Sequence, residues 1–305
     1  MRILKDILSK LKKEESGLNV LSLFDGISCG QVALERAGIK VNNYFASEID
    51  KNAIKVTMAN YPNTIQIGDV RNIDVKTLPK IDLLIGGSPC QDLSCCKNDG
   101  DGLKGKKSNL FFEYVRILKE VKPKYFLLEN VASMREDDKD TISSIIGVQP
   151  VMIDSADFSA QYRKRYYWTN IKFETKNYKK CPLVLGDIAE EWVEEKYYYN
   201  YPLLKIDMTK QVCAIMDFKN NEMHKRVFNP AFKCSTLTTC GGGNTQKKIL
   251  DKGRARKLTP LEYERLQTLP DNYTACVSNT HRYSACGNGW TVDVIAHILK
   301  GIKNK

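Results

Sequence analysis

The sequence predicts an α/β fold, with a doubly wound, mostly parallel sheet and a small, irregular second domain. The first observation is a unit repeated between Asn19 and Ile171, in which a short apolar run, a turn and a helical stretch follow one another, as in βαβ crossovers. The second is a change after Ile171, where Lys, Tyr and Gly-, Asn- or Pro-containing breaks become frequent. The third is length, because 305 residues with 42% hydrophobic side chains can bury a sizeable core.

Each element of the sheet domain is predicted from its own pattern. Short apolar runs bounded by turn residues indicate strands, whereas apolar residues recurring at helical spacing indicate the helices between them. The expected helices are Gln31 to Ala37, Lys51 to Asn60 and Leu110 to Lys119. The expected strands are Val20 to Phe24, Asn43 to Ile49, Thr64 to Val70, Ile81 to Gly87, Tyr125 to Val131, Val151 to Ile153 and Arg165 to Ile171.

The C-terminal part contains a strong helix start. Thr259 is placed as N-cap, Pro260 as first helical residue and Glu262 as the partner of the cap, a capping box. A further helical stretch from Thr291 to Ile302 closes the chain. We therefore expect a catalytic domain over residues 1–171, a recognition domain over 172–256, and C-terminal helices over 257–305 that complete the first domain.

Composition limits the partners and the location. With 47 Lys and Arg against 36 Asp and Glu, the net charge is +11, which favours a polyanion such as nucleic acid, although solubility alone could account for it. The ten cysteines include no C-x-x-C pair, and the three histidines are scattered, so we expect reduced thiols and no metal. No apolar run is long enough to span a membrane, and Met1 to Glu15 lacks the apolar core of a secretory signal. A cytoplasmic protein without a membrane partner is expected.

Acidic residues at successive strand ends indicate a small ligand. The first strand runs into Phe24 to Gln31, where Gly26 and Gly30 lie four apart; this spacing differs from G-x-G-x-x-G and fits an adenosine-type ligand better than a dinucleotide. Glu48 follows Asp25 by 48 − 25 = 23 residues, near the offset of a ribose-binding acid. Asp69 ends the third run and is placed to bind an adenine amino group. The alternative is that each acid is a solvated strand end or an N-cap.

Further reactive residues are predicted at the same edge of the sheet. Cys90 lies on a Gly- and Pro-containing turn after the fourth run, where a thiol is exposed and can act as a nucleophile, although packing is the usual role of an intracellular cysteine. Glu129 is delivered by the next run. The segment around Arg163 and Arg165 alternates its side chains, so that Gln161 and both arginines face one way; the alternative is a basic surface edge.

Five motifs in this order resemble the C5-cytosine DNA methyltransferases. The resemblance covers nearly the whole chain and implies the S-adenosylmethionine-dependent methyltransferase type of α/β fold. Stretches around Val20, Asn109 and Pro150 are similar to animal de novo enzymes, and compact bacterial and phage enzymes share them. The motifs are Phe24-Asp25-Gly26-x-x-x-Gly30, Pro89-Cys90-Gln91, Glu129-Asn130-Val131, Gln161-x-Arg163-x-Arg165 and Gly287-Asn288-Gly289-Trp290-Thr291-Val292.

The resemblance implies a reaction and a cofactor. Cys90 would add to carbon 6 of an extruded cytosine, Glu129 would hold N3 and the exocyclic amine, and Arg165, with Arg163, would support the base. The methyl donor would be S-adenosyl-L-methionine. Its contacts would be Phe24, Asp25, Gly26, Ile27, Ser28, Cys29, Glu48, Asp69, Val70, Asn288, Gly289 and Trp290.

The expected partner is double-stranded DNA. A loop from Gln91 to Ser108 would close over the flipped base, because carbon 5 is inaccessible inside a duplex. The protein would be monomeric and associated with the nucleoid through DNA. Expected DNA contacts are Gln91, Ser94, Thr236, Thr238, Gly241 and Gly242, with phosphate attraction from Lys179, Lys180, Lys219, Lys225, Arg226, Lys233, Lys247 and Lys248.

Two other functions remain open at this stage. A tRNA methyltransferase of the same family would use the same chemistry, although the Cys-Phe-Thr motif usual in that branch is absent. A nonenzymatic regulator with this fold typically loses Pro-Cys-Gln or the Glu-Asn-Val acid, and this chain keeps both. The last motif reads Gly-Asn-Gly-Trp where many bacterial members have Gly-Asn-Ser, so the contacts of Trp290 are the least defined. The DNA target and an accompanying restriction enzyme stay undetermined.

Overall fold

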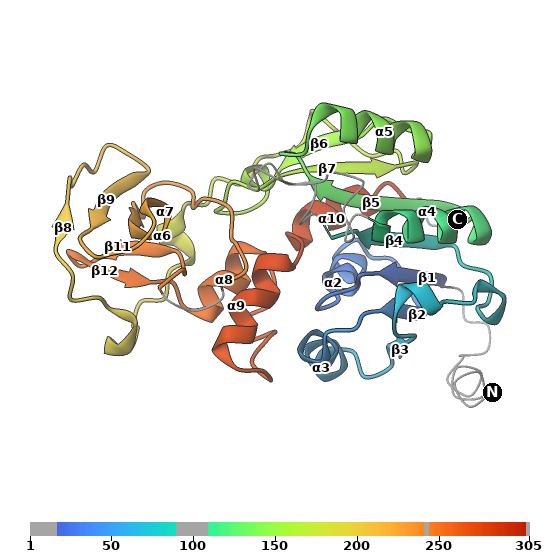
Figure 1. Cartoon of the computed structure of the whole chain (residues 1–305), viewed down its shortest axis with the longest axis horizontal. Coiled ribbons are helices and arrows are strands. Elements are labelled where there is room, and N and C mark those ends of the chain that lie inside the picture. The colour runs from blue at the N-terminus through green and yellow to red at the C-terminus, as the bar shows by residue number, and fades with distance from the viewer. Residues whose placement is uncertain (1–16, 90–108, 241–243, 303–305) are drawn as a thin grey trace. The chain divides into compact units, whose positions relative to one another are not determined.

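The structure is a computed structural model that describes residues 17–89, 109–240 and 244–302. Two compact units are distinguished (Figure 1). The first contains the described residues of Met1–Ile153, Lys164–Tyr178 and Asp293–Lys305, and the second those of Asp154–Arg163 and Lys179–Val292.

The units do not follow the predicted domain boundaries. Residues 257–292 belong to the second unit, because helix α8 (Pro260–Leu266) packs against α9 (Asn279–Asn288) and α6 (Leu185–Ile188). Residues 154–163 also belong to it, through a bridge between Gln161 and Cys234. The assignment of catalytic and recognition roles to parts of the chain stays a prediction.

The first unit is built on a seven-stranded sheet of order β3-β2-β1-β4-β5-β7-β6. Neighbours from β3 to β5 pair in parallel, whereas β7 runs antiparallel to β5. The predicted mostly parallel sheet is therefore confirmed. Its strands are β1 (Leu18–Leu23), β2 (Val41–Ser47), β3 (Ile65–Gln66), β4 (Leu83–Gly87), β5 (Tyr125–Val131), β6 (Val151–Asp154) and β7 (Lys164–Thr169).

Alternate residues of this sheet are buried on opposite faces. Leu21 and Leu23 join a core cluster with Phe111 and Tyr114 of α4, while the intervening Ser22 is also only 1% exposed. A sheet covered on both faces is typical of βαβ folds. The helices of this unit are α2 (Cys29–Arg36), α3 (Lys51–Asn60), α4 (Asn109–Val121), α5 (Glu136–Ile146) and nearly all of α10 (Val292–Leu299), with short 3₁₀ helices η1 (Val70–Asn72) and η2 (Val75–Thr77).

The predicted third strand is shorter than expected. Only Ile65 and Gln66 pair with β2, because Gly68 has a φ of +79° and turns the chain. Asp69 then accepts a hydrogen bond from the Arg71 amide and starts η1 at Val70. Aspartate is a preferred N-cap, so the alternative interpretation of Asp69 as a cap is correct for this part of its role.

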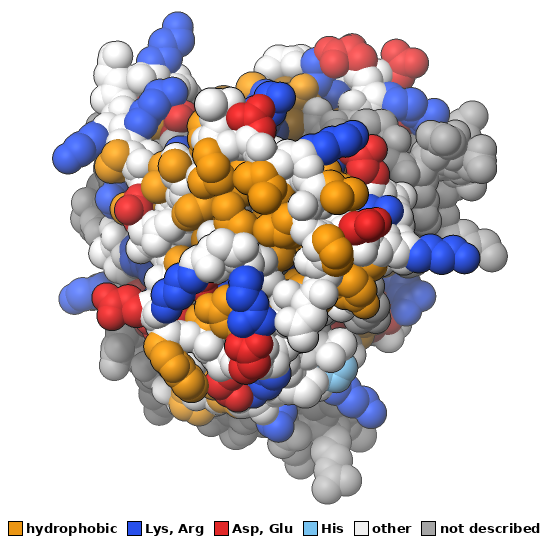
Figure 2. All heavy atoms as spheres, turned by 90° about the vertical axis from the view of Figure 1, so that its left-hand side faces the viewer, with side chains coloured by type: hydrophobic (Ala, Val, Ile, Leu, Met, Phe, Trp, Pro, Cys, Tyr) orange, Lys and Arg blue, Asp and Glu red, His pale blue; other side chains and the backbone are white. Residues whose placement is uncertain are grey.

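The second unit contains a five-stranded sheet of order β12-β11-β10-β9-β8. Its core is small, with Cys213, Ala214, Met216, Val227 and Ala255 buried together. Figure 2 shows apolar side chains gathered on the face that carries β8, where Leu204 and Ile206 are 44% and 61% exposed. The elements are β8 (Leu203–Leu204), β9 (Val212–Met216), β10 (Arg226–Phe228), β11 (Lys248–Asp251), β12 (Arg254–Lys257), α6, α7 (Glu222–Lys225), α8, α9, η4 (Ser155–Asp157) and η5 (Glu195–Tyr197).

The predicted capping box at α8 is confirmed. The Glu262 amide donates to Thr259 Oγ1 at 3.2 Å, and the Thr259 amide donates to Glu262 Oε2 at 2.7 Å. The same carboxylate binds the Arg256 guanidinium at 2.7 Å, and both side chains are at most 1% exposed. Pairing offsets part of the large cost of burying the two charges.

The described ranges lack two kinds of feature. In them, no helix is long and apolar enough to cross a membrane. Across the same residues, no three His, Cys, Asp or Glu side chains are grouped so as to hold a metal ion. The segment Met1 to Glu15, for which no secretory signal is predicted, lies outside the described residues.

Candidate active site

Parallel pairing brings the ends of five strands to one edge of the first unit's sheet. The strand order reverses between β1 and β4, since β2 and β3 extend to one side and β5 to the other. Open α/β sheets bind ligands at such a switch point, outside the carboxyl ends of the strands. The edge therefore gathers the turn after β1, Glu48 after β2, Asp69 after β3 and Ser88 after β4.

The turn after β1 is built from unusual backbone conformations. Phe24, Gly26 and Ser28 have φ angles of 57°, 58° and 56°. Positive φ is uncommon for residues other than glycine and marks strain that often accompanies function. Ile27, Ser28 and Cys29 have buried side chains, so they would meet a ligand with main-chain atoms. An added Cβ on Gly26 would have no atom within 4 Å, which leaves open space over the turn.

Asp25 is the most perturbed acid of this edge. Its Oδ1 accepts from the Tyr44 hydroxyl at 2.7 Å, and its Oδ2 accepts from Ser28 Oγ. Burial raises the pKa of Asp25 to about 6, although hydrogen bonds from Ser22, Ser28 and Tyr44 act in the opposite direction. A buried, hydrogen-bonded acid at a strand end is a functional-site candidate.

Glu48 stabilises the same turn. Its Oε2 accepts from the Gly26 amide at 2.8 Å, and its Oε1 accepts from the amides of Ile49 and Asp50 at 2.7 and 2.8 Å. The carboxylate thus ties the end of β2 to the turn after β1. The neighbouring Ile49 side chain is 69% exposed, so an apolar surface lies beside this acid.

Asp69 has a side-chain partner two residues further along the chain. Arg71 Nε donates to Asp69 Oδ1 at 3.0 Å, and this hydrogen bond holds the pKa of Asp69 below its ordinary value. Val70 is buried, and its carbonyl accepts from Arg116 of α4 at 3.2 Å. The segment is therefore fixed from two sides.

Glu129 and Arg165 form an ion pair across β5 and β7. Arg165 Nε lies 2.9 Å from Glu129 Oε1, and the side chains are 14% and 12% exposed. The antiparallel register explains the contact, because Val131 faces Arg165 and Glu129 faces Tyr167, making the pair diagonal neighbours on one face. The structure thus brings together two of the predicted catalytic residues.

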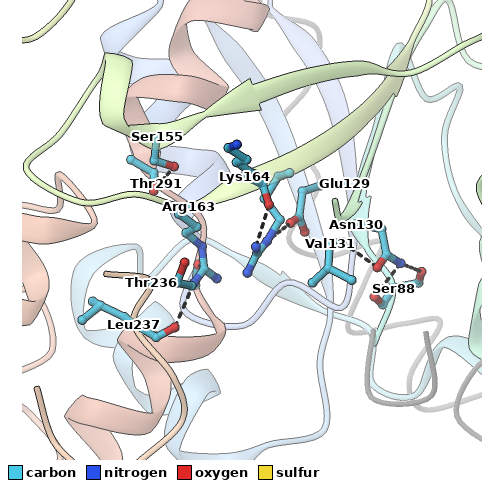
Figure 3. A network of polar contacts seen from close by, with 12 residues as sticks. Ser88, Glu129, Asn130, Val131, Ser155, Arg163, Lys164, Thr236, Leu237 and Thr291 are labelled. Atoms are coloured by element: carbon cyan, nitrogen blue, oxygen red, sulfur yellow. Dashed lines mark hydrogen bonds and ion pairs between the residues drawn. The ribbon is translucent and has the colours of Figure 1, made fainter. Parts of the chain in front are cut away.

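Asn130 contacts the residue that precedes Pro89. Its Nδ2 donates to Ser88 Oγ at 3.1 Å and to the Ser88 carbonyl at 3.3 Å (Figure 3). Asn130 is 1% exposed and Ser88 4%, so this link between β5 and the end of β4 is well sheltered. Cys90, Gln91 and Ser94 lie outside the described residues, and their predicted roles stay predictions.

Arg163 has a different environment from Arg165. It is 5% exposed, and its guanidinium donates to the Leu237 carbonyl at 3.1 Å (Figure 3). The same guanidinium donates to the carbonyls of Gly287 and Gly289, also at 3.1 Å each. The predicted alternation is confirmed, since Gln161 and Arg163 are buried and Tyr162 is 45% exposed. These three carbonyls engage both terminal nitrogens of the guanidinium, and the predicted catalytic role of Arg163 stays a prediction.

Asn288, Gly289 and Trp290 belong to the second unit. Asn288 is exposed, Gly289 and Trp290 are half-buried, and the Gly289 carbonyl also accepts from Gln267 Nε2 at 3.0 Å. Their predicted contact with the methyl donor stays a prediction.

Among the predicted DNA contacts, Thr238 is exposed and the Thr236 hydroxyl donates to the Tyr162 carbonyl at 2.7 Å. Gly241 and Gly242 lie outside the described residues.

Two predicted phosphate-binding lysines have internal roles. Lys233 Nζ donates to the carbonyls of Ser159, Cys181 and Leu183 at 2.7 to 3.1 Å. Lys248 is 1% exposed and donates to the carbonyls of Asn244 and Gln246, while burial lowers its pKa to about 8. The expectation of phosphate contacts is wrong for Lys248 and Lys233, because main-chain carbonyls occupy both ammonium groups.

Sequence reasoning missed three residues of these networks. Tyr44 and Arg71 bind the predicted acids Asp25 and Asp69. Gln267 binds the Gly289 carbonyl. For Arg71 the two-residue spacing from Asp69 was a usable signal, whereas Tyr44 and Gln267 are brought in only by the fold.

A mostly parallel sheet with acids and a positive-φ turn at its switch point is an arrangement that α/β methyltransferases share with other doubly wound enzymes. The chain belongs to the C-5 cytosine-specific DNA methylase family, whose pattern matches residues 18–304. It is thus a member of a family of DNA (cytosine-5-)-methyltransferases, as the sequence resemblance predicts.

Individual relatives agree with this family. The type II methyltransferase M1.ScrFI of Lactococcus lactis subsp. cremoris is 32% identical over 92% of this chain and 77% of its own length. The type II methyltransferase M.NlaX of Neisseria lactamica is 29% identical, with 93% of this chain and 96% of the relative covered. The orphan methyltransferase M.SPRI of Bacillus phage SPR is 29% identical over 74% of this chain, which spans 64% of the phage protein.

Solved structures share the fold at low sequence identity. The Entamoeba histolytica methyltransferase EhMeth has a TM-score of 0.72 and 18% identity, covering 94% of this chain and 98% of its own. The S. pombe Dnmt2 methyltransferase has a TM-score of 0.65 and 17% identity over 92% and 97% of the two chains.

Proposed function

We propose that this chain transfers a methyl group from S-adenosyl-L-methionine to carbon 5 of cytosine in double-stranded DNA. The observation that carries this function is the Glu129–Arg165 pair on the sheet that also bears the turn after β1. The family and the type II names of the relatives support DNA as substrate.

The residues at the edge fit an adenosine-type donor. Gly26 and Gly68 both have positive φ, and nothing lies within 4 Å of a Cβ added to either, so a ligand can approach the main chain. Glu48 and Asp69 supply carboxylate oxygens at neighbouring strand ends. When bound, the donor supplies a methyl group on a sulfonium. By the family resemblance, Asn288, Gly289 and Trp290 are further expected donor contacts.

The protein supplies the groups that activate the base. Cys90, as thiolate, would form a bond from Sγ to carbon 6, which makes carbon 5 nucleophilic enough to take the methyl group. Glu129, held by Arg165, would bind N3 and the exocyclic amine and offset the charge that develops on the ring. Loss of the carbon 5 proton then breaks the Sγ–carbon 6 bond and releases the thiol.

The test is transfer of labelled methyl to DNA by purified protein. Cys90→Ser is expected to abolish transfer, because a hydroxyl ionises far less readily than a thiol. The half-buried Cys181 gives a matched control, and Cys181→Ser is expected to keep wild-type transfer. Undiminished activity of Cys90→Ser would refute the covalent mechanism.

Two further experiments test the covalent mechanism and the choice of DNA over tRNA. DNA containing 5-fluorocytosine should be trapped covalently by wild-type protein and not by Cys90→Ser, since fluorine blocks the final elimination. Side-by-side assays with DNA and tRNA identify the substrate, and exclusive methylation of tRNA would contradict the proposal. Bisulfite sequencing of a methylated plasmid then gives the target.

A further inference from the structure

Gln267, directly after α8, lies at the centre of a buried polar network in the second unit. Its side chain is 0% exposed. The amide Nε2 donates to the carbonyls of Cys286 and Gly289 at 2.6 and 3.0 Å. Its Oε1 accepts from Gln161 Nε2 and from Thr291 Oγ1, each at 2.8 Å. A carboxamide can donate two hydrogen bonds and accept two, so this side chain uses its full hydrogen-bonding capacity.

The network continues to the segment Thr236–Thr238 through two side chains. Gln161, also 0% exposed, accepts from the Leu237 amide at 3.3 Å. Arg163 donates to the Leu237 carbonyl at 3.1 Å, and with its other terminal nitrogen to Gly287 and Gly289. Both main-chain groups of Leu237 are therefore held by side chains that are also bonded, directly or through Gln267, to residues 286–291.

The two segments also touch directly. A Cβ built on Gly287 would lie 2.5 Å from the Thr238 carbonyl carbon and oxygen and 2.6 Å from the Thr239 nitrogen. No side chain fits in this space, so the Gly287 main chain packs against the irregular segment that carries the exposed Thr238. Displacement of either segment has to disturb the other.

We propose that Gln267 and Arg163 are positioning residues that lock the proposed DNA-contacting segment Thr236–Thr238 to the proposed donor-contacting segment Gly287–Thr291. The inference rests on the proposed function and assigns a role to Gln267 that its position after the helix does not by itself indicate. Because Gln161, Leu237 and Gln267 are buried and Gly289 is half-buried, a shift of one segment leaves sheltered polar groups in the other unpaired, which is costly. Donor affinity and choice of DNA target thus depend on the same contacts.

The experiment compares Gln267→Leu with a control in α8, the helix that ends directly before Gln267. Glu264→Gln is matched, because Glu264 is also 0% exposed and binds Arg282 and Thr274 at 2.8 and 2.9 Å, outside the two segments. Binding of S-adenosylhomocysteine is measured by calorimetry. Bisulfite sequencing of the plasmid first gives the target sequence. KM and kcat are then measured on DNA that contains this sequence and on the same DNA with one flanking base pair changed.

Gln267→Leu is expected to weaken S-adenosylhomocysteine binding about tenfold and to reduce discrimination between the two DNAs about tenfold, as expected for unpaired buried groups. KM values should rise more than kcat falls, since Gln267 does not touch the reacting atoms. Glu264→Gln should change neither the binding of S-adenosylhomocysteine nor the discrimination between the two DNAs, even if it lowers thermal stability as much as Gln267→Leu does.

A second variant keeps the test decisive if Gln267→Leu does not fold. Gln267→Glu retains the shape and places an oxygen against the carbonyls of Cys286 and Gly289, so it should give the same pattern. This inference alone is overturned if wild-type protein methylates DNA but the Gln267 variants and Glu264→Gln change donor binding and DNA discrimination to the same extent. Failure of wild-type protein to methylate any cytosine substrate would overturn the proposed function and this inference with it.

Discussion

At the scale of single residues, the carboxyl edge of the sheet holds acids with unequal environments. Asp25 is buried against Tyr44 and Ser28, and its pKa is raised to about 6. Asp69 is paired with Arg71, and its pKa is lowered. Burial disfavours a carboxylate, whereas a hydrogen-bonding cation favours it. The two acids therefore differ in charge between pH 4 and 6, although they lie at strand ends of the same sheet.

The raised pKa of Asp25 predicts a pH dependence of stability. Native Asp25 binds its proton up to about pH 6 and the unfolded chain only to about 4, so this residue lowers the free energy of unfolding as pH rises through that window. Asp25→Asn removes the effect and should gain up to about 3 kcal/mol relative to wild type between pH 4 and 7. Urea unfolding of wild type and Asp25→Asn at pH 4 and pH 7 measures this difference in the free energy of unfolding. A wild-type-to-variant difference that is independent of pH would refute the assignment.

Glu129 gives a prediction about catalysis. Glu129→Gln keeps the shape but removes the negative charge held by Arg165, so single-turnover methyl transfer should fall by about a hundredfold or more. Donor affinity should stay unchanged. The Glu113–Arg116 pair of α4, at 2.8 Å, supplies the control Glu113→Gln, for which wild-type transfer is expected. Comparable losses in both variants would show that Glu129 acts only through stability.

At the scale of elements, helix ends and the strand register position the site. The β5–β7 register makes Glu129 and Arg165 neighbours, and a slip of one residue would turn these side chains to opposite faces. In the second unit, the start of α8 gathers Thr259, Glu262, Arg256 and Glu190 into one buried group. Local capping and long-range packing therefore act on the same residues.

The capping box predicts a stability change. Thr259→Ala removes the acceptor of the Glu262 amide and the contact with Glu190, so the free energy of unfolding should fall by about 1 kcal/mol. Thr280 lies exposed in the first turn of α9, and Thr280→Ala is the control. Chemical denaturation followed by circular dichroism measures both, and equal stabilities of the two variants would contradict the capping role.

At the scale of the whole molecule, the net charge is +11. The lysines that contribute to it divide into those with partners inside the protein and those exposed to solvent. Lys233 and Lys248 donate hydrogen bonds to main-chain carbonyls inside the second unit. Lys219 is exposed, and its attraction to DNA phosphate stays a prediction. Net charge therefore overstates the number of lysines that can contribute to DNA binding.

This division predicts how salt acts on DNA binding. The logarithm of the association constant should fall linearly with the logarithm of salt concentration, with a slope of about −0.9 for each phosphate contact. Lys219→Ala should make the slope less negative by about 0.9, whereas Lys233→Ala should leave it unchanged and lower stability. Fluorescence anisotropy over a salt series distinguishes them, and a reduced slope for Lys233→Ala would refute its internal role.

Much of the first unit was predictable from the sequence. The helix Lys51–Asn60 and the strand Tyr125–Val131 agree in both bounds with their predictions, because periodicity, caps and apolar runs are local signals. The third strand was overestimated, since the run around Thr64 is apolar enough for a strand but Gly68 turns the chain. The boundary at residue 257 differed, because the packing of α8 with α9 and α6 is not a local property.

The sequence by itself determined the fold class, the strand ends that bear Asp25, Glu48, Asp69 and Glu129, and the family. These features depend on motifs and spacing along the chain. Only the tertiary structure decided the partners, placing Arg165 on Glu129 and Arg163 on three main-chain carbonyls. The physical reason is that two arginines in one alternating segment look alike in sequence, whereas a buried guanidinium takes the role set by the acceptors that long-range packing brings to it.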